Sequence, residues 1–455
     1  MGASNRRILG GAAAILVVVV LSPGRAALAA TLEVGTGKPF ARVEEANAKA
    51  RPGDVILVHP LPGGEPYRKT GVYVRQSNLT FRGVPGADGG RVRISAEGFH
   101  PSGRGSTPRA IFQFNPGTDQ CLLQGFELFG AHNESHNGAG VRINGANHVT
   151  IRNCDIHDND MGVMSNGDGT PQRGVNQRIE HSTIHHNGDY RHPGYNHNLY
   201  LGGTSVTLHG CEVHSSLTGH NVKSRAHHTR VEYCYVHHSA NREFDLVDAA
   251  DTERPESNAV LLGNAIVKDP SCKGNRGVVH FGQDGGRRHD GTIHLVFNTI
   301  VTPFISPLVE LSSPPAKARL VGNFIHDGGV RQGGQKIAGV RAGAAMENVT
   351  GEHNWLSGGF EGVGQTRLSP ETSVFQRFQG PVFVAADRHD YRLIAAAADQ
   401  AKAAFSQKLV QLPAVPGAPA KAEQSPLALQ YHHPAGCQQR PREAKPTLGA
   451  FGHQP

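Results

Sequence analysis

Large polar side chains recur at one position of a repeated pattern between Gly194 and Asp248. A four-residue unit appears as His197-Asn198-Leu199-Tyr200, as His220-Asn221-Val222-Lys223 and, more loosely, as Arg242-Glu243-Phe244-Asp245. This is the densest polar cluster in the sequence, and we expect the functional site to lie there.

The residue types in this cluster suit β-elimination on a uronic acid polymer. Removing the weakly acidic C5 proton of a uronate requires a cation at the carboxylate, a base near C5 and an acid at the leaving oxygen. Lys223 is the candidate base if Arg225 lowers its pKa, and Arg225 can bind the carboxylate in bidentate fashion. Tyr200 or His280 would protonate the leaving group. We expect Asp245 to be part of the same catalytic group.

Alternation along the strands predicts which side chains face outward. One apolar residue per copy should face the interior: Val163, Leu199, Val222, Phe244, Val279 and Val309. The residues after them should form an outer column that reaches solvent: Met164, Tyr200, Lys223, Asp245, His280 and Glu310. The residues before the apolar set should also face outward. These are Asn198, Asn221 and Glu243, which are candidate substrate-binding residues together with His197, His220, Arg242 and Glu310.

Other interpretations of the same residues stay open. The outer column is also typical of a solvated face with salt-bridged rungs, such as Lys223 with Asp245. Glu243 and Asp245 lie two residues apart, about 6.5–7 Å by strand rise, which suits an inverting glycoside hydrolase. The acidic side chains of Asp245, Asp248 and Asp251 could hold Ca²⁺.

Further copies of a short strand pattern predict the scaffold that positions these residues. They begin at Leu123, Ile151, Ile179, Leu208, Val231, Leu262, Val296 and Val321. Strands of constant length separated by turns of variable length indicate a solenoid of β-coils. Asn153, Asn264, Asn298 and Asn323 should occupy one tight bend per coil, because asparagine tolerates a left-handed backbone. Residues 40–50 are patterned as an amphipathic helix that would cover the first coil.

Two other columns are predicted from the repeats. His157, His185, His214 and His237 should align as exposed histidines beside the turns. Cys154, Cys211 and Cys234 should stack inside with free thiols, because side chains one rung apart lack the torsion of a disulfide. A disulfide among Cys121, Cys272 and Cys437 remains open.

This pattern resembles the right-handed parallel β-helix superfamily, which includes pectate lyases, the chondroitinase B and alginate lyase family, and mannuronan epimerases. The resemblance rests on the helix followed by Pro52-Gly53-Asp54, the repeated coils and the late Asp390-Tyr391-Arg392-Leu393, and it covers most of residues 31–395. It implies an all-β, right-handed parallel β-helix with a short N-terminal capping helix.

The nearest resemblance is to the chondroitinase B and alginate lyase family. That family places its catalytic lysine in a Lys-Ser pair on the same strand, which Val222-Lys223-Ser224 matches. The family's arginine one coil later corresponds here to Phe244-Asp245, and its calcium-binding glutamates correspond to Leu217-Thr218-Gly219. The resemblance therefore implies a polysaccharide lyase whose catalytic arginine and calcium ligands differ from those of the family.

Composition and the termini predict the cellular setting. Residues 1–29 have the form of a signal peptide, which indicates a secreted or periplasmic protein without stable membrane insertion. The formal net charge of +7 is mild, which suits an acidic polysaccharide and not nucleic acid. We expect a β-helix domain over 30–395, a C-terminal tail over 396–455 that is packed along the solenoid or partly disordered, and a monomer.

The sequence thus predicts a secreted polysaccharide lyase that acts on a uronic-acid-containing polymer, with Ca²⁺ as the one cofactor in question. A non-catalytic glycan-binding or cell-surface β-helix is the alternative from another class. A glycoside hydrolase or uronate epimerase on the same fold is the third.

Overall fold

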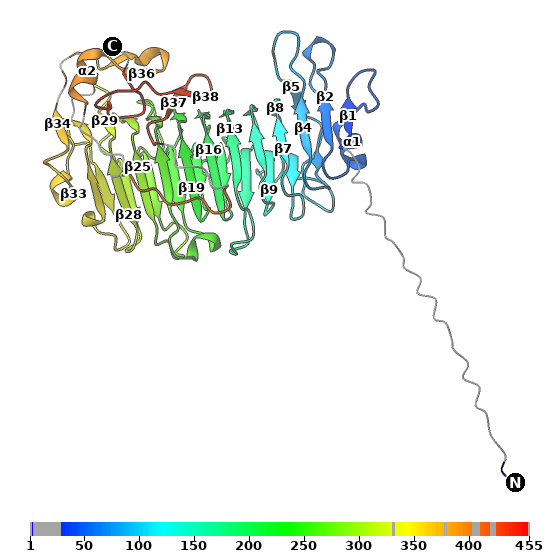
Figure 1. Ribbon diagram of the computed structural model, residues 1–455, viewed down its shortest axis with the longest axis horizontal. Helices are drawn as coiled ribbons and strands as arrows, with labels where there is room; N and C mark the ends of the chain where they lie inside the picture. The colour runs from blue at the N-terminus through cyan, green and yellow to red at the C-terminus, as the bar shows by residue number, and fades with distance from the viewer. Residues whose placement is uncertain are drawn as a thin grey trace.

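The protein is a right-handed parallel β-helix, seen in a computed structural model with its coils side by side along one axis (Figure 1). The structure describes residue 2 and residues 29–329, 333–376, 378, 380–402, 410–418 and 425–453. The predicted signal peptide, residues 1–29, lies outside the described residues except for Gly2 and Ala29. Among the described residues, no helix has the length and apolar character needed to cross a membrane.

Three parallel sheets of 13, 11 and 10 strands run along the solenoid in the described part of the chain. Sheet A consists of β1 (Thr31–Val34), β2 (Val55–Val58), β4 (Thr80–Gly83), β7 (Leu122–Gln124), β10 (Thr150–Arg152), β13 (Gln177–Glu180), β16 (Ser205–His209), β19 (His228–Glu232), β22 (Ala259–Leu262), β25 (Thr292–Val296), β28 (Lys317–Val321), β31 (Val349–Glu352) and β33 (Arg367–Leu368).

Sheet B consists of β5 (Val92–Ser95), β8 (Phe126–Phe129), β11 (Asp155–His157), β14 (Thr183–His185), β17 (Glu212–His214), β20 (Tyr235–His237), β23 (Ala265–Val267), β26 (Thr299–Val301), β29 (Phe324–His326), β32 (Trp355–Ser357) and β34 (Val374–Gln376). Sheet C consists of β3 (Val72–Tyr73), β6 (Ala110–Phe114), β9 (Ala139–Asn144), β12 (Met161–Asn166), β15 (Leu199–Leu201), β18 (Val222–Ser224), β21 (Phe244–Val247), β24 (Val279–Gly282), β27 (Val309–Ser312) and β30 (Ala338–Val340).

Short helices interrupt or cap the coils. They are α1 (Val43–Lys49), α2 (Ala395–Gln400) and the 3₁₀ turns η1 (Pro62–Gly64), η2 (Ala250–Glu253), η3 (Met346–Asn348), η4 (Val363–Gln365) and η5 (Ala386–Arg388). Helix α1 confirms the predicted capping helix, because its Val43 and Ala46 are buried in the same core as the first coils. It covers apolar surface that the first coil would otherwise expose.

The interior of sheet C has the predicted register. Leu199, Val222, Phe244, Val279 and Val309 pair rung by rung and are fully buried. A shift of one residue would turn every side chain to the opposite face, so this alignment fixes which residues lie on the outer side.

A ladder of buried asparagines fills the turn between sheets A and B. The side-chain amide of Asn264 donates to Asn298 (3.0 Å), that of Asn298 to Asn323 (3.0 Å) and that of Asn323 to Asn354 (2.9 Å). The prediction that Asn153 belongs to this column is wrong. Asn153 has the left-handed backbone (φ 48°). The ladder asparagines lie one position later in their coils, and their side chains bond the backbone of the preceding coil.

The chain after β34 folds back over the outside of the solenoid (Figure 1). It contains two antiparallel pairs, β35 (Phe383–Ala385) with β36 (Asp390–Leu393) and β37 (Leu429–His432) with β38 (Gly436–Gln439). Tyr391, Tyr431 and Phe451 pack there against Tyr235 of sheet B and its neighbours. The described residues of the predicted C-terminal tail thus lie against sheet B and also against sheet A, where the Ser205 hydroxyl donates to the Pro416 carbonyl oxygen (2.7 Å).

Candidate functional site

The strands of sheet C bring the predicted outer column together. Tyr200, Lys223, Asp245, His280 and Glu310 are successive partners on β15, β18, β21, β24 and β27. Five successive coils therefore contribute one continuous row of polar side chains. This arrangement confirms the predicted column.

The prediction that Lys223 and Asp245 reach solvent is wrong. Their exposed fractions are 8% and 2%, because the loop after β24 folds over the row. The carboxylate of Asp248 holds this loop by accepting the backbone N–H groups of Asp284 (2.5 Å), Gly285 (2.8 Å) and Arg287 (2.5 Å). The loop in turn places Asp284 against the row.

Asp245 is the centre of the site. Its carboxylate oxygens lie 2.9 Å from Lys223 Nζ, 2.8 Å from His280 Nδ1 and 3.4 Å from His220 Nε2. Burial favours the neutral acid, but the hydrogen bond from His280 and the surrounding positive charge outweigh it and hold the pKa of Asp245 well below its ordinary value. Asp245 is therefore a fixed negative charge.

Lys223 does not have the lowered pKa that a general base needs. Burial opposes its charge, but the carboxylates of Asp245 and Asp284 outweigh burial and raise the pKa of Lys223 above its ordinary value. The expectation that Arg225 would make Lys223 a free amine is wrong, because the effect of the two carboxylates, 2.9 and 3.2 Å from the ammonium, exceeds that of Arg225. In this arrangement Lys223 is a cation.

His280 connects Asp245 to two residues that sequence reasoning missed. Nδ1 lies 2.8 Å from an Asp245 carboxylate oxygen, and Nε2 accepts from Arg341 Nη2 (3.0 Å). Nε2 also lies 2.7 Å from Ser312 Oγ, whose hydroxyl donates to the Gln283 carbonyl oxygen (2.9 Å). Ser312, His280 and Asp245 are all buried, so a polymer cannot reach the serine hydroxyl or the imidazole. The chain of contacts fixes the position of His280. It does not offer His280 as the acid at a leaving group.

Arg225 and Tyr200 form the accessible edge of the site. The Arg225 guanidinium lies 5.8 Å from the centre of the Tyr200 ring, and its Nη2 is 3.6 Å from Asp284 Oδ2. Asp284 Oδ2 also lies 3.2 Å from Lys223 Nζ. Arg225 Nε is buried and, among the described residues, has no hydrogen-bond partner. Two cations therefore converge on one carboxylate beside a tyrosine.

A second group of ion pairs extends the row toward β27 and β30. Arg242 Nη2 lies 3.0 Å from Glu310 Oε2, and Arg341 Nε lies 2.5 Å from Glu310 Oε1. Arg242 also approaches Asp245 at 3.5 Å. Arg341 comes just after β30, outside the repeats that the sequence made visible.

The prediction that Asn198, Asn221 and Glu243 face outward is wrong. These residues precede the strands and turn inward, where Asn198 donates to Asn221 (2.8 Å) and Asn221 donates to Glu243 (2.6 Å). Glu243 ends this ladder 3.5 Å from Lys268 Nζ, and both side chains have an exposed fraction of 0%. Burial raises the pKa of Glu243. Glu243 therefore cannot flank a glycosidic bond. The glycoside hydrolase interpretation needs both Glu243 and Asp245 at that bond, so the structure does not support it.

His197 and His220 are buried behind the row. Their rings stack with centroids 5.1 Å apart, and His197 Nδ1 accepts the backbone N–H of His220 at 3.0 Å. Burial lowers the pKa of His220 to about 4, so it is neutral at neutral pH. Gly219 permits this packing, because a Cβ there would lie 1.8 Å from the Asn196 carbonyl oxygen.

The three acidic residues considered as Ca²⁺ ligands each accept hydrogen bonds or ion pairs from different protein groups. Asp248 holds the loop described above, Asp251 accepts the backbone N–H groups of Gly169 (2.9 Å) and Gly203 (3.0 Å), and Asp245 pairs with Lys223 and His280. Carboxylates already used in this way do not fit a shared Ca²⁺ ion.

The other two predicted columns are present. His157, His185, His214 and His237 stack with ring centroids 4.9–5.0 Å apart. The prediction that they are exposed is wrong, because the first three are half-buried and His237 is buried. Cys211 N donates to Cys234 Sγ (3.3 Å), which confirms the stacked thiols. All six cysteines lie in the described part of the chain and are free, so the disulfide left open among Cys121, Cys272 and Cys437 is not formed.

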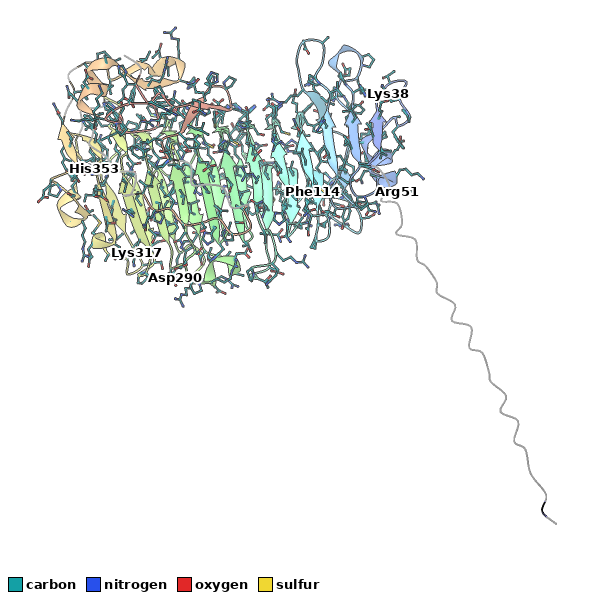
Figure 2. The ribbon with its side chains drawn as sticks, viewed as in Figure 1. Lys38, Arg51, Phe114, Asp290, Lys317 and His353 are labelled. Atoms are coloured by element: carbon teal, nitrogen blue, oxygen red, sulfur yellow. The ribbon has the colours of Figure 1, made fainter. Side chains whose placement is uncertain are left out.

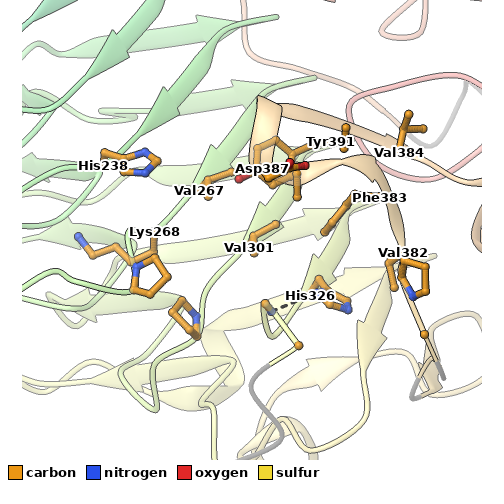
Figure 3. Close-up of a pocket in the computed structure, with 18 residues that line it drawn as sticks. His238, Val267, Lys268, Val301, His326, Val382, Phe383, Val384, Asp387 and Tyr391 are labelled. Atoms are coloured by element: carbon orange, nitrogen blue, oxygen red, sulfur yellow. Dashed lines mark hydrogen bonds between the residues drawn. The ribbon is translucent and has the colours of Figure 1, made fainter.

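A cavity of about 520 Å³ lies elsewhere, between sheet B and the chain that folds back over it (Figure 3). Val267, Val301, His326, Phe383 and Tyr391 are among its lining residues. Lys268 also borders it, but its ammonium group bonds Asn241 O and pairs with Glu243. None of the predicted site residues borders this cavity.

Comparisons with known proteins agree with the architecture. The family described as "right handed beta helix region" matches residues 121–282. A search of curated proteins found no match. The match supports the right-handed parallel β-helix fold that the sequence predicted.

Three solved structures are similar to this chain. Pectate lyase Pel9A is 13% identical, with a TM-score of 0.44 over 94% of this chain and 97% of that one. An alginate lyase from Paenibacillus sp. str. FPU-7 is 13% identical, with a TM-score of 0.38 over 77% and 98%. A DFA-IIIase from Arthrobacter chlorophenolicus A6 is 10% identical, with a TM-score of 0.28 over 77% and 99%.

Proposed function

We propose that this protein binds a uronic-acid-containing polysaccharide on the outer side of sheet C and cleaves it by β-elimination. The observation that carries the proposal is the convergence of Lys223 and Arg225 on the carboxylate of Asp284, at 3.2 and 3.6 Å. A uronate carboxylate has the same charge and shape as this side chain. The Asp284 position therefore marks where the substrate carboxylate would bind.

The role of each residue follows from its contacts. Lys223 and Arg225 would neutralise the substrate carboxylate and so increase the acidity of the C5 proton. Tyr200 is the accessible group beside them that can carry a proton. In the reacting state its phenolate oxygen would take the proton from C5, a C4–C5 double bond would form, and the C4–O bond would break. The same hydroxyl would then protonate the leaving oxygen, provided that the C5 proton and the leaving oxygen lie on the same side of the sugar ring.

A second function is favoured by a separate observation. Lys223 pairs with Asp245, and Arg242 and Arg341 both pair with Glu310, so much of the row is already neutralised. Such a row is typical of a binding face that needs no proton transfer. A non-catalytic, secreted glycan-binding protein would use the same cations.

The two functions are separated by measuring cleavage and binding together. The protein should be incubated with alginate, pectate, glycosaminoglycans and bacterial exopolysaccharides, and the unsaturated uronate product should be followed by its ultraviolet absorbance. Tyr200→Phe should lower the rate by at least about 100-fold and leave polymer binding intact, because it removes the proton carrier.

Arg225→Ala should weaken both binding and cleavage. Lys317→Ala is the matched control, because Lys317 is an exposed cation on sheet A, labelled at the lower edge of Figure 2. Binding without product on every polymer would favour the non-catalytic function. If the protein neither binds nor cleaves any of the acidic polymers, both proposed functions are overturned.

A further inference from the structure

We infer that His136, Asp189 and His192 form a binding site for a divalent transition metal ion of the Zn²⁺ type. One ligand atom from each of the three side chains lies within 4.8 Å of the other two. In the described part of the chain, this is the only group of three or more histidine, cysteine or acidic side chains that approach so closely. The site is separate from the row on sheet C and does not rest on the proposed lyase function.

The three residues come from two loops that connect sheet B to sheet C. His136 lies between β8 and β9, and Asp189 and His192 lie between β14 and β15. His136 Nδ1 is 2.9 Å from Asp189 Oδ2, and the centroids of the His136 and His192 rings are 3.5 Å apart. Within the described residues, neither ring nitrogen of His192 has a hydrogen-bond partner. A metal ion would use that free imidazole and replace the proton shared by His136 and Asp189.

A buried side chain positions both loops. Asn196 is fully buried, its amide donates to the His136 carbonyl oxygen (2.6 Å), and its Oδ1 accepts the backbone N–H of Asp189 (3.2 Å). Asp160 adds support by accepting the backbone N–H groups of Asn133 (2.9 Å) and Gly138 (3.0 Å) on either side of His136. Supporting contacts of this kind hold ligands ready for a metal and reduce the ordering that binding requires.

The donor set selects the class of ion. Two imidazoles and one carboxylate suit Zn²⁺ and neighbouring transition metals, whereas Ca²⁺ needs six or more oxygen ligands. Bound Zn²⁺ keeps its ligand atoms about 3–3.5 Å apart, so the loops need only a small closure. Three protein ligands leave one coordination position for water or another ligand.

Arg191 is the residue that opposes binding. Its guanidinium contacts both oxygens of Asp189, at 2.9 Å to Oδ1 and 2.6 Å to Oδ2, while 75% of its side chain is exposed. A metal ion would displace one of these contacts. Because Arg191 can move into solvent, it lowers the affinity without blocking the site.

The test is a titration of metal-stripped, tag-free protein with Zn²⁺ in competition with a chromophoric chelator. The wild type should bind one Zn²⁺ at this site, and His192→Ala or His136→Ala should weaken that binding at least about 100-fold. Arg191→Ala should strengthen it several-fold, because it removes the competing cation. His132→Ala, which changes a nearby histidine paired with Asp160, should bind as the wild type does.

Two results would overturn the inference. One is a wild type that does not take Zn²⁺ from the chelator. The other is Zn²⁺ binding that survives both His136→Ala and His192→Ala at wild-type strength, which would place the ion on other histidines. Thermal unfolding of each metal-free variant shows whether it is folded, and addition of Ca²⁺ should not displace Zn²⁺.

Discussion

Lys223 Nζ lies 2.9 Å from Asp245 Oδ2, although the two residues belong to successive coils. This pair decides the role of Lys223, because a lysine held beside a buried carboxylate stays protonated. Lys223→Arg should therefore keep a substantial part of polymer binding and cleavage, whereas Lys223→Ala should lose most of both.

The measurement is KM and kcat for the wild type and the two variants on the polymer that the protein cleaves. If Lys223 were the general base, arginine would be as inactive as alanine, because arginine does not give up its proton. Equal inactivity of two folded variants would contradict the role of Lys223 as a carboxylate-binding cation.

Asp284 competes with the substrate if it occupies the carboxylate position. Asp284→Asn should then lower the dissociation constant for an acidic polymer several-fold and reduce its dependence on salt concentration. Glu253→Gln, which neutralises another exposed acid that pairs with this loop, is the control. Weaker binding by Asp284→Asn would show that the aspartate supports the site instead of competing in it.

The ion pair of Glu243 and Lys268 should carry a large share of local stability. Lys268→Met leaves the Glu243 carboxyl buried without its cation, so the free energy of unfolding should fall by about 3–5 kcal/mol. Urea unfolding would measure this loss, with the exposed Lys273→Met as a control that should change stability by less than about 0.5 kcal/mol.

A double variant checks the cause of that loss. Adding Glu243→Gln to Lys268→Met removes the unpaired acid and should restore part of the stability. If the double variant is no more stable than Lys268→Met alone, lost packing of the lysine stem explains the effect instead.

Acid should destabilise the protein through its buried neutral histidines. Burial lowers the pKa of His220 and His289 to about 4, from an ordinary value of 6.5. The unfolded chain thus binds protons first, so this contribution to stability is complete above about pH 6.5 and falls as the pH drops toward 4. Urea midpoints across this range would measure it, and His220→Gln should flatten the dependence. A midpoint that stays constant would contradict the neutral state of these histidines.

The cysteines should all react as thiols. Protein unfolded without reductant should give six thiols per chain with a chromogenic thiol reagent, because the six cysteines are free in the structure. Four or fewer would indicate a disulfide.

The sequence was sufficient to predict the strands and the register of sheet C. Val222 and Phe244 repeat at one position, and alternation then assigns Lys223 and Asp245 to the outer side. The same rule failed for Asn198 and Asn221, because these residues stand just before their strands, where the backbone turns and the side chain bonds the turn. Alternation applies only to residues within a strand.

The enclosure of the site was beyond sequence reasoning. Nothing in the residues after β24 shows that Asp248 holds their backbone or that Asp284 reaches Lys223. Arg341 and Ser312 join the site through contacts across sheet C that have no sequence signature. The raised pKa of Lys223 follows from its contacts with Asp245 and Asp284, so its role could be assigned only from the structure.

The chain that folds back over sheet B has a consequence for biosynthesis. Tyr235 belongs to a coil made midway through translation, but the residues that shield it, Tyr391, Tyr431 and Phe451, are made much later. Until they arrive, a nascent chain presents an uncovered apolar strip, which is a surface for chaperones or for aggregation. Completion of the fold is therefore tied to synthesis of residues 391–451, even though each coil can stack as soon as its predecessor has formed.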